Sequence, residues 1–123
     1  MKKFLALLLL LGACSDKTPA DISITELKKD ALILDVRTVA EHNESSLVQK
    51  HWLVPLNQLD AKDFIQEKRL DGSKPLYILC RSGKRAAVAA EKFKQAGFKK
   101  AVVIRGGILA AQKAGIPTKQ TAE

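Results

Sequence analysis

Cysteine is scarce in this sequence. Only Cys14 and Cys80 occur among 123 residues, so no disulfide framework of the kind that holds small secreted domains together is possible. With no second thiol nearby to resolve a disulfide, a dithiol redox cycle within the chain is excluded. The two histidines, His42 and His51, stand apart without spaced cysteines. We therefore expect no metal site and no cofactor.

Aromatic residues make up only 5% of the chain, although its formal charge is +8. Proteins that bind single-stranded nucleic acid combine basic side chains with aromatic platforms. Here the lysines are spread along the sequence without interleaved aromatic residues, which argues against nucleic-acid binding. The positive charge instead favours attraction of small anions.

Long apolar runs are also missing except near the amino terminus. Residues 4–11 are apolar and follow Lys2 and Lys3, but the run is too short to span a bilayer. Residues 11–14 (LGAC) resemble a bacterial lipobox. We predict a lipoprotein signal peptide over residues 1–13, with an ordinary secretory signal or an uncleaved leader as the alternatives. Cleavage would lower the formal charge to about +6.

The lipobox resemblance implies that Cys14 becomes the lipidated amino terminus, followed by a linker over residues 14–21. Ser15 after it is typical of lipoproteins sent to the outer membrane. The protein is therefore expected to be periplasmic and held at that membrane by its lipid, since several acyl chains anchor stably. Cys80 would then be the only free thiol.

The most informative stretch combines a strand, a loop and a helix. Residues 76–79 (LYIL) form a short apolar run that predicts a strand buried on both faces. Residues 86–96 are strong helix formers that stop at Gly97, a predicted left-handed cap. Between them lies the six-residue loop 80–85 (CRSGKR). Open α/β sheets bind ligands at such carboxyl-end loops.

Cys80 opens this loop and is the candidate nucleophile. A thiolate reacts where a thiol does not, and Arg81, Lys84 and Arg85 would favour the anionic sulfur. The amino terminus of the following helix and converging loop N–H groups would act in the same direction. The alternative is a small buried core cysteine, against which the three adjacent cations argue.

Three motifs resemble the single-domain rhodaneses, in particular the periplasmic phage-shock type. Residues 80–85 resemble the active-site loop of that family, and residues 32–38 (LILDVRT), with Glu41, its first strand and Asp-Val-Arg signature. Residues 105–108 (RGGI) and 114–117 (AGIP) resemble its closing turn and end. Three motifs in this order are a fairly strong signal. The resemblance covers residues 22–118 and leaves 119–123 as a tail.

The resemblance implies a rhodanese-like α/β fold with an open, mostly parallel five-stranded sheet and helices on both faces. It also implies a sulfurtransferase that moves sulfane sulfur from a donor such as thiosulfate, through a Cys80 persulfide, to a thiol or cyanide. The implied site residues are Cys80 as the catalytic residue, Arg81, Ser82, Gly83, Lys84 and Arg85 for substrate binding, and Asp35, Arg37, Glu41, Gly106 and Gly107 as structural neighbours. We expect Arg37 to pair with Glu41 and to fix the loop.

Two other functions stay open. The phosphatases that resemble rhodaneses need Cys-x5-Arg, whereas Arg85 comes one position too early and Ala86 fills the required place. A phosphatase or arsenate reductase is therefore the weaker alternative. The stronger one is a non-catalytic sulfur carrier or partner-binding lipoprotein, because residues 46–55 lack both glycines and the histidine of the family. We interpret His51 there as surface or loop packing and Trp52 as a core or rim aromatic.

The remaining elements are short. Residues 22–24 read as an edge strand and residues 31–36 as a buried strand. We predict that Thr25 caps a turn over 26–29 and that Asn57 caps a helix beginning at residue 58. The last strand is expected over residues 101–104.

Overall fold

The computed structural model describes residues 18–121. The predicted signal peptide over residues 1–13 and the predicted lipid attachment site Cys14 lie outside this part of the chain. Among the described residues, no helix has both the length and the apolar character that crossing a membrane requires.

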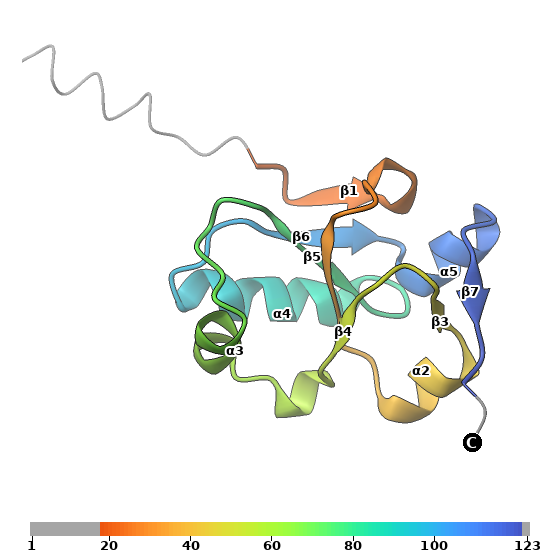
Figure 1. Cartoon of the computed structure of the whole chain (residues 1–123), viewed down its shortest axis with the longest axis horizontal. Helices are drawn as coiled ribbons and strands as arrows, with labels where there is room; N and C mark the ends of the chain where they lie inside the picture. The colour runs from red at the N-terminus through yellow and green to blue at the C-terminus, as the bar shows by residue number, and fades with distance from the viewer. Residues whose placement is uncertain (1–17, 122–123) are drawn as a thin grey trace, which may run out of the picture.

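A five-stranded sheet forms the centre of the domain (Figure 1). Its spatial order is β1-β6-β5-β2-β4, and each neighbouring pair runs parallel. The strands are β1 (Asp21–Ser23), β2 (Leu32–Asp35), β4 (Trp52–Leu53), β5 (Leu76–Leu79) and β6 (Ala101–Arg105). The predicted five-stranded parallel sheet is confirmed, and β1 is an edge strand as expected.

Helices cover both faces of the sheet, as predicted. They are α2 (Val39–Glu44), α3 (Ala61–Glu67), α4 (Lys84–Gln95) and α5 (Gly107–Lys113), with the 3₁₀ turns η1 (Ile24–Glu26) and η2 (Leu56–Gln58). Leu76 and Ile78 of β5 belong to the core that α3 and α4 cover. Tyr77 and Leu79 pack into the core beneath α5 and η1. Successive side chains of β5 thus point to opposite faces, as a strand requires.

β5 lies in the middle of the sheet between β6 and β2. Leu76, Ile78 and Leu79 are fully buried, which confirms the prediction from the apolar run. α4 then ends at Gln95, and Gly97 adopts a φ of +96°, the predicted left-handed cap. The candidate loop therefore lies between two rigid elements.

Two helix starts differ from the sequence prediction. The predicted cap Thr25 instead donates its N–H to the Ser23 hydroxyl at 3.2 Å, and Ser23 caps η1. The predicted cap Asn57 lies inside η2, and Asp60 caps α3. Ser, Thr, Asn and Asp cap helices about equally well, so tertiary packing selects among them.

A second, two-stranded sheet was not predicted. β3 (Ser46–Leu47) pairs antiparallel with β7 (Thr118–Lys119), close to the carboxyl end of the described chain (Figure 1). β7 carries regular structure to Lys119, one residue beyond the expected domain end. The segment after β3 leads into β4, where Trp52 packs edge-to-face on Phe64 with ring centroids 5.3 Å apart. Trp52 is therefore the rim aromatic that was expected.

Candidate active site

Cys80 follows β5 directly at the carboxyl edge of the sheet. Its Sγ accepts a hydrogen bond from the N–H of Gly83 at 2.9 Å. Gly83 precedes the first residue of α4 and has a φ of +116°, a left-handed conformation that glycine adopts without strain. The sulfur is thus bonded at the amino terminus of a twelve-residue helix, where the helix dipole favours negative charge.

The loop is shorter than the sequence predicts, because α4 begins at Lys84 rather than at residue 86. Lys84 and Arg85 therefore belong to the first helical turn, while the side chains of Arg81 and Ser82 are exposed in the loop. Cys80 itself is 1% exposed. The geometry combines the two sequence interpretations: the thiol is buried, and it accepts a hydrogen bond suited to an anion.

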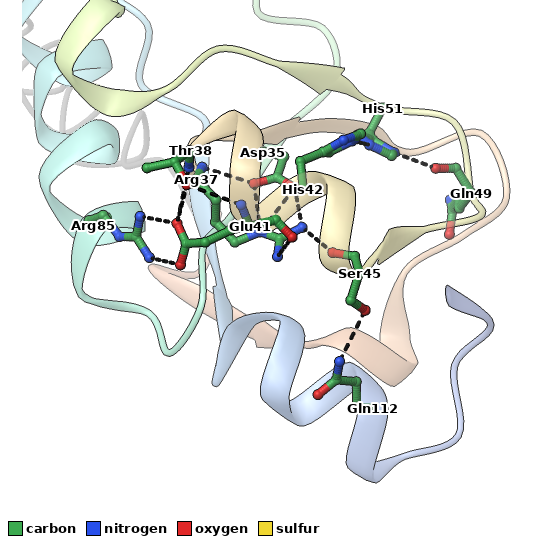
Figure 2. A network of polar contacts seen from close by, with 10 residues as sticks. All are labelled: Asp35, Arg37, Thr38, Glu41, His42, Ser45, Gln49, His51, Arg85 and Gln112. Atoms are coloured by element: carbon green, nitrogen blue, oxygen red, sulfur yellow. Dashed lines mark hydrogen bonds and ion pairs between the residues drawn. The ribbon is translucent and has the colours of Figure 1, made fainter. Parts of the chain in front are cut away.

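Arg85 is held by Glu41 from α2. Its two terminal nitrogens donate to the two carboxylate oxygens at 2.7 and 2.9 Å (Figure 2). The hydrogen bonds from Arg85 are the main cause that lowers the pKa of Glu41 from 4.5 to about 2. The same hydrogen bonds raise the pKa of Arg85. The side chains are 33% and 27% exposed, so the pair lies at the edge of the site rather than in open solvent.

The predicted pairing of Arg37 with the carboxylate of Glu41 is wrong. Arg37 donates to the Glu41 backbone carbonyl at 3.3 Å, and its guanidinium forms an ion pair with Asp35 at 2.8 Å. Asp35 and Arg37 are 0% and 2% exposed. A further guanidinium bond of Arg37, to the carbonyl of Ser45 at 2.7 Å, ties the end of α2 to the end of β2 (Figure 2). This buried pair fixes the segment that carries Glu41.

Gly106 and Gly107 bring the start of α5 against the loop. The N–H of Ile108 donates to the Cys80 carbonyl at 2.8 Å, and the N–H of Leu109 donates to the Arg81 carbonyl at 3.3 Å. Gly107 has a φ of +58°, and a Cβ there would come closer than 3.0 Å to the backbone of residues 80 and 81. Only glycine permits this approach, so the start of α5 can pack directly against the loop backbone and support it.

A hollow of about 190 Å³ adjoins the exposed side of the loop. Arg81 of the loop and Ile108 and Leu109 of α5 line one part of it. Arg37, Glu41, Glu44, Ser45 and Gln112 complete its wall. Charged groups of the segment 37–45 and apolar groups of α5 thus meet in one small concave surface that reaches Arg81, the residue after Cys80.

His42 and His51 do not stand apart, contrary to the expectation from sequence. Their Nε2 atoms are 2.8 Å from each other. Burial, the largest cause, lowers the pKa of His42. His51 is half-buried and also contacts the Gln49 carbonyl, which agrees with its interpretation as loop packing. The sequence offered no signal for this contact, since nine positions separate the two residues in an irregular segment.

A parallel α/β domain with one cysteine in the loop between a central strand and its helix defines a class of cysteine-dependent α/β proteins. The family within that class is shown by a family model, the rhodanese-like domain, which matches residues 23–114. The chain belongs to this family, and a single rhodanese-like domain is what the sequence resemblance had predicted.

Among curated proteins, the chain is 32% identical over 76 residues to a putative sulfur carrier protein of Bacillus subtilis. This match covers 62% of the chain and only 38% of that protein. The chain is 28% identical to a sulfurtransferase of Allochromatium vinosum, over 72% of the chain and 78% of that protein.

Among solved structures, a rhodanese-related protein of Thermoplasma volcanium superposes with a TM-score of 0.66 at 27% identity. The match covers 82% of this chain and 98% of that one. The fold thus agrees between the sequence and structural comparisons, and the two curated relatives are named as a putative sulfur carrier and a sulfurtransferase.

Replacing Gly107 by alanine tests the support that α5 gives to the loop. Gly107→Ala combines backbone strain with a clash against residues 80 and 81, so we expect a loss of about 3 kcal/mol in unfolding free energy. Gly115→Ala is the matched control, because Gly115 has a φ of +77° but open space around its Cβ position. It should cost only about 1 kcal/mol. Equal losses in urea denaturation would contradict the close packing argued here.

Glu41→Gln tests the ion pair with Arg85. Glutamine keeps the capping oxygen that faces Thr38 and removes the charge. Because the folded pKa of Glu41 lies below the unfolded value, its contribution is fully present above about pH 4.5 and is lost as the pH falls toward 2. We expect wild type to exceed the variant by about 1 to 2 kcal/mol at pH 7 after allowance for solvent screening.

That difference should shrink on acidification in parallel urea titrations. Glu67→Gln, an exposed carboxylate in the last turn of α3, serves as the control and should change stability little at any pH. A difference for Glu41→Gln that stays constant from pH 7 to pH 2 would disprove the electrostatic origin.

Proposed function

We propose that this protein is a sulfurtransferase that takes sulfane sulfur from a small anionic donor such as thiosulfate onto Cys80. The observation that carries the proposal is the hydrogen bond from the Gly83 N–H to Sγ at the start of α4. This position favours an anionic sulfur both as thiolate and as persulfide.

The reaction would proceed in two displacements. The Cys80 thiolate attacks the outer sulfur of thiosulfate, a new S–S bond forms, and the old S–S bond breaks with its electron pair leaving on sulfite. The terminal sulfur of the persulfide is then attacked by a thiolate or by cyanide, and Cys80 leaves as the thiolate. No external oxidant, reductant or cofactor is needed for this cycle.

The cations around the loop divide into two groups. Arg85 is committed to Glu41 by two hydrogen bonds, so it is a positioning residue for the loop and α2. Arg81 and Lys84 are exposed. These two are the groups we assign to the sulfonate oxygens of the donor, and Arg81 also lines the hollow beside the loop.

The same geometry disfavours phosphoester chemistry. The place where a phosphatase loop has its arginine is Ala86, which is fully buried on the core side of α4. Arg85 is turned to Glu41. Neither position therefore supplies an arginine that could form two hydrogen bonds to a phosphate held by the loop N–H groups.

A second candidate function is sulfur carriage without turnover. Cys80 is only 1% exposed, and a buried persulfide would be protected until a partner opens access to it. The name of the Bacillus subtilis relative, a putative sulfur carrier, points in this direction. A carrier would hold the persulfide but release it slowly to small acceptors.

We further propose export and anchoring through Cys14, at the periplasmic side of the outer membrane. The support is the sequence alone: two lysines, an apolar run and the lipobox-like residues 11–14. Ser15 after the cysteine favours the outer membrane over the inner one.

Mass spectrometry after exposure to thiosulfate tests the nucleophile. We expect Cys80 in the wild type to gain the mass of one sulfur atom and Cys80→Ser to gain none.

Arg81→Gln and Lys84→Gln should each raise the KM for thiosulfate about tenfold, the value of one charge-assisted contact. Lys94→Gln, an exposed lysine in the last turn of α4, is the control and should leave KM unchanged.

The kinetics with cyanide distinguish the two candidates. Steady double-displacement turnover supports the enzyme, whereas persulfide formation without turnover supports the carrier. Full transfer activity in Cys80→Ser would rule out both.

Metabolic labelling with a radioactive fatty acid tests the anchor in a bacterial host that processes lipoproteins. Wild type should incorporate label and sediment with the outer-membrane fraction, while Cys14→Ser should lose the label. Ser15→Asp should keep the label and move the protein to the inner membrane. An unlabelled wild-type protein would refute the lipoprotein proposal and leave the Cys80 chemistry untouched.

A further inference from the structure

The two histidines of the chain, His42 and His51, lie close to each other and to the carboxylate of Asp35. His42 comes from α2 and His51 immediately precedes β4, and their rings lie side by side, tilted by 56° with centroids 5.0 Å apart (Figure 2). Asp35, the last residue of β2, lies beside them, and one donor atom from each of the three residues lies within 4.8 Å of the others. Three separate segments thus bring two imidazoles and one carboxylate together.

The hydrogen bonds of His51 select its tautomer. Its Nδ1 lies 2.8 Å from the carbonyl oxygen of Gln49, which can only accept, so Nδ1 carries the proton. Nε2 of His51 therefore presents a lone pair toward His42. Metal-binding histidines are oriented in this way, with the distal nitrogen bonded to a carbonyl or carboxylate. His42 can present its own Nε2 lone pair by a change of neutral tautomer, with no net release of a proton.

The spacing of the two nitrogens suits one ion between them. Two nitrogens at about 2.0 Å from a single ion lie about 2.8 Å apart at a right angle and about 3.3 Å apart at a tetrahedral angle. The observed separation is 2.8 Å. A square or octahedral ion matches this separation once the rings turn so that both lone pairs point to the ion instead of along the hydrogen bond, and a tetrahedral ion also needs an opening of about half an ångström.

Asp35 supplies the third donor under a constraint. Its oxygens already accept from Arg37 at 2.8 to 3.2 Å, and the residue is 0% exposed. The guanidinium fixes the carboxylate in place and offsets part of its charge. The two imidazoles are therefore the principal ligands, and Asp35 contributes one oxygen with reduced charge.

We propose that His42, His51 and Asp35 form a binding site for a divalent first-row transition ion of borderline softness, such as Zn²⁺, Ni²⁺ or Cu²⁺. Two imidazole nitrogens and one carboxylate oxygen bind these ions more strongly than they bind Mg²⁺ or Ca²⁺, which prefer oxygen ligands alone. The ion links α2 and the segment before β4 to the end of β2. This proposal departs from the expectation from sequence of no metal site, and it does not depend on the proposed sulfur transfer.

The consequence for the protein is local rigidity. The segment from β3 to β4 departs from the family pattern and contains only two short strands of two residues each. An ion held by His51 stabilises the folded form by a free energy that grows with the logarithm of its concentration relative to the dissociation constant. A zinc-dependent rise in melting temperature is therefore expected.

Nitrogen-15 NMR of the full chain in detergent micelles tests the site with Zn²⁺ as the probe. The chain carries the substitutions Cys14→Ser and Cys80→Ser, so that no thiol competes for the ion. Since the sequence has only two histidines, each imidazole signal belongs to His42 or His51. One equivalent of Zn²⁺ should shift the Nε2 resonances of both rings together.

Variants define the ligands. His51→Gln should lower the zinc affinity about 100-fold or more and abolish the rise in melting temperature. Lys50→Gln, its exposed neighbour, is the matched control and should bind as the parent does. His42→Gln should reproduce the loss. The NMR titration needs none of these variants, so it decides even if one of them fails to fold.

The outcomes that overturn the proposal are specific. If Zn²⁺ leaves both rings unshifted at one equivalent, or shifts them with different midpoints, the histidines form a hydrogen-bonded pair only. Binding by His51→Gln with unchanged affinity would have the same meaning.

Discussion

The parallel register between β2 and β5 is the constraint on which the rest of the structure depends. Asp35 lies opposite Leu79, so both strands end at the same edge and Cys80 emerges beside the segment that begins with Val36. The N–H of Val36 bonds to the Leu79 carbonyl at 2.9 Å and continues this pairing past the strands. A slip of one residue would turn Cys80 toward the opposite face of the sheet. β5 is buried and continuously apolar. This specifies its register strongly, because any polar residue that a shift brought into the strand would face a hydrophobic core.

Charge pairing then divides the basic residues that follow Cys80. Three basic residues follow Cys80, and equal roles for them would be a fair first expectation. The structure separates them, because Glu41 engages Arg85 with both oxygens, while Asp35 and Arg37 form a buried pair that holds the Glu41 segment. Two ion pairs in series thus connect β2, α2 and the start of α4. The pairs fix geometry, whereas Arg81 and Lys84 stay exposed and are the cations available for the proposed attraction of an anionic donor.

Much of the fold could be predicted from sequence because the informative elements are long or patterned. The apolar run of β5, the alanine-rich helix α4 and Gly97 follow from periodicity and propensity. The two-residue strands β3 and β7 could not be predicted, since two residues contain no period. The capping residues were misplaced because Ser23 and Thr25 have similar intrinsic capacity. The partner of Glu41 is 44 positions away, and no local rule connects it to Arg85.

The burial of Cys80 limits how a donor can reach it. Gly107 and Ile108 hold the backbone of residues 80 and 81 from the side of α5, and α4 begins at Lys84, four positions after Cys80. The backbone therefore has little room to open without breaking the support from α5 or the first turn of α4. The side chains of Arg81 and Ser82, by contrast, are exposed. Access to the sulfur is consequently a matter of side-chain movement in the loop. In the sulfur transfer proposed above, the anionic group of the donor would draw Arg81 aside and so open this access.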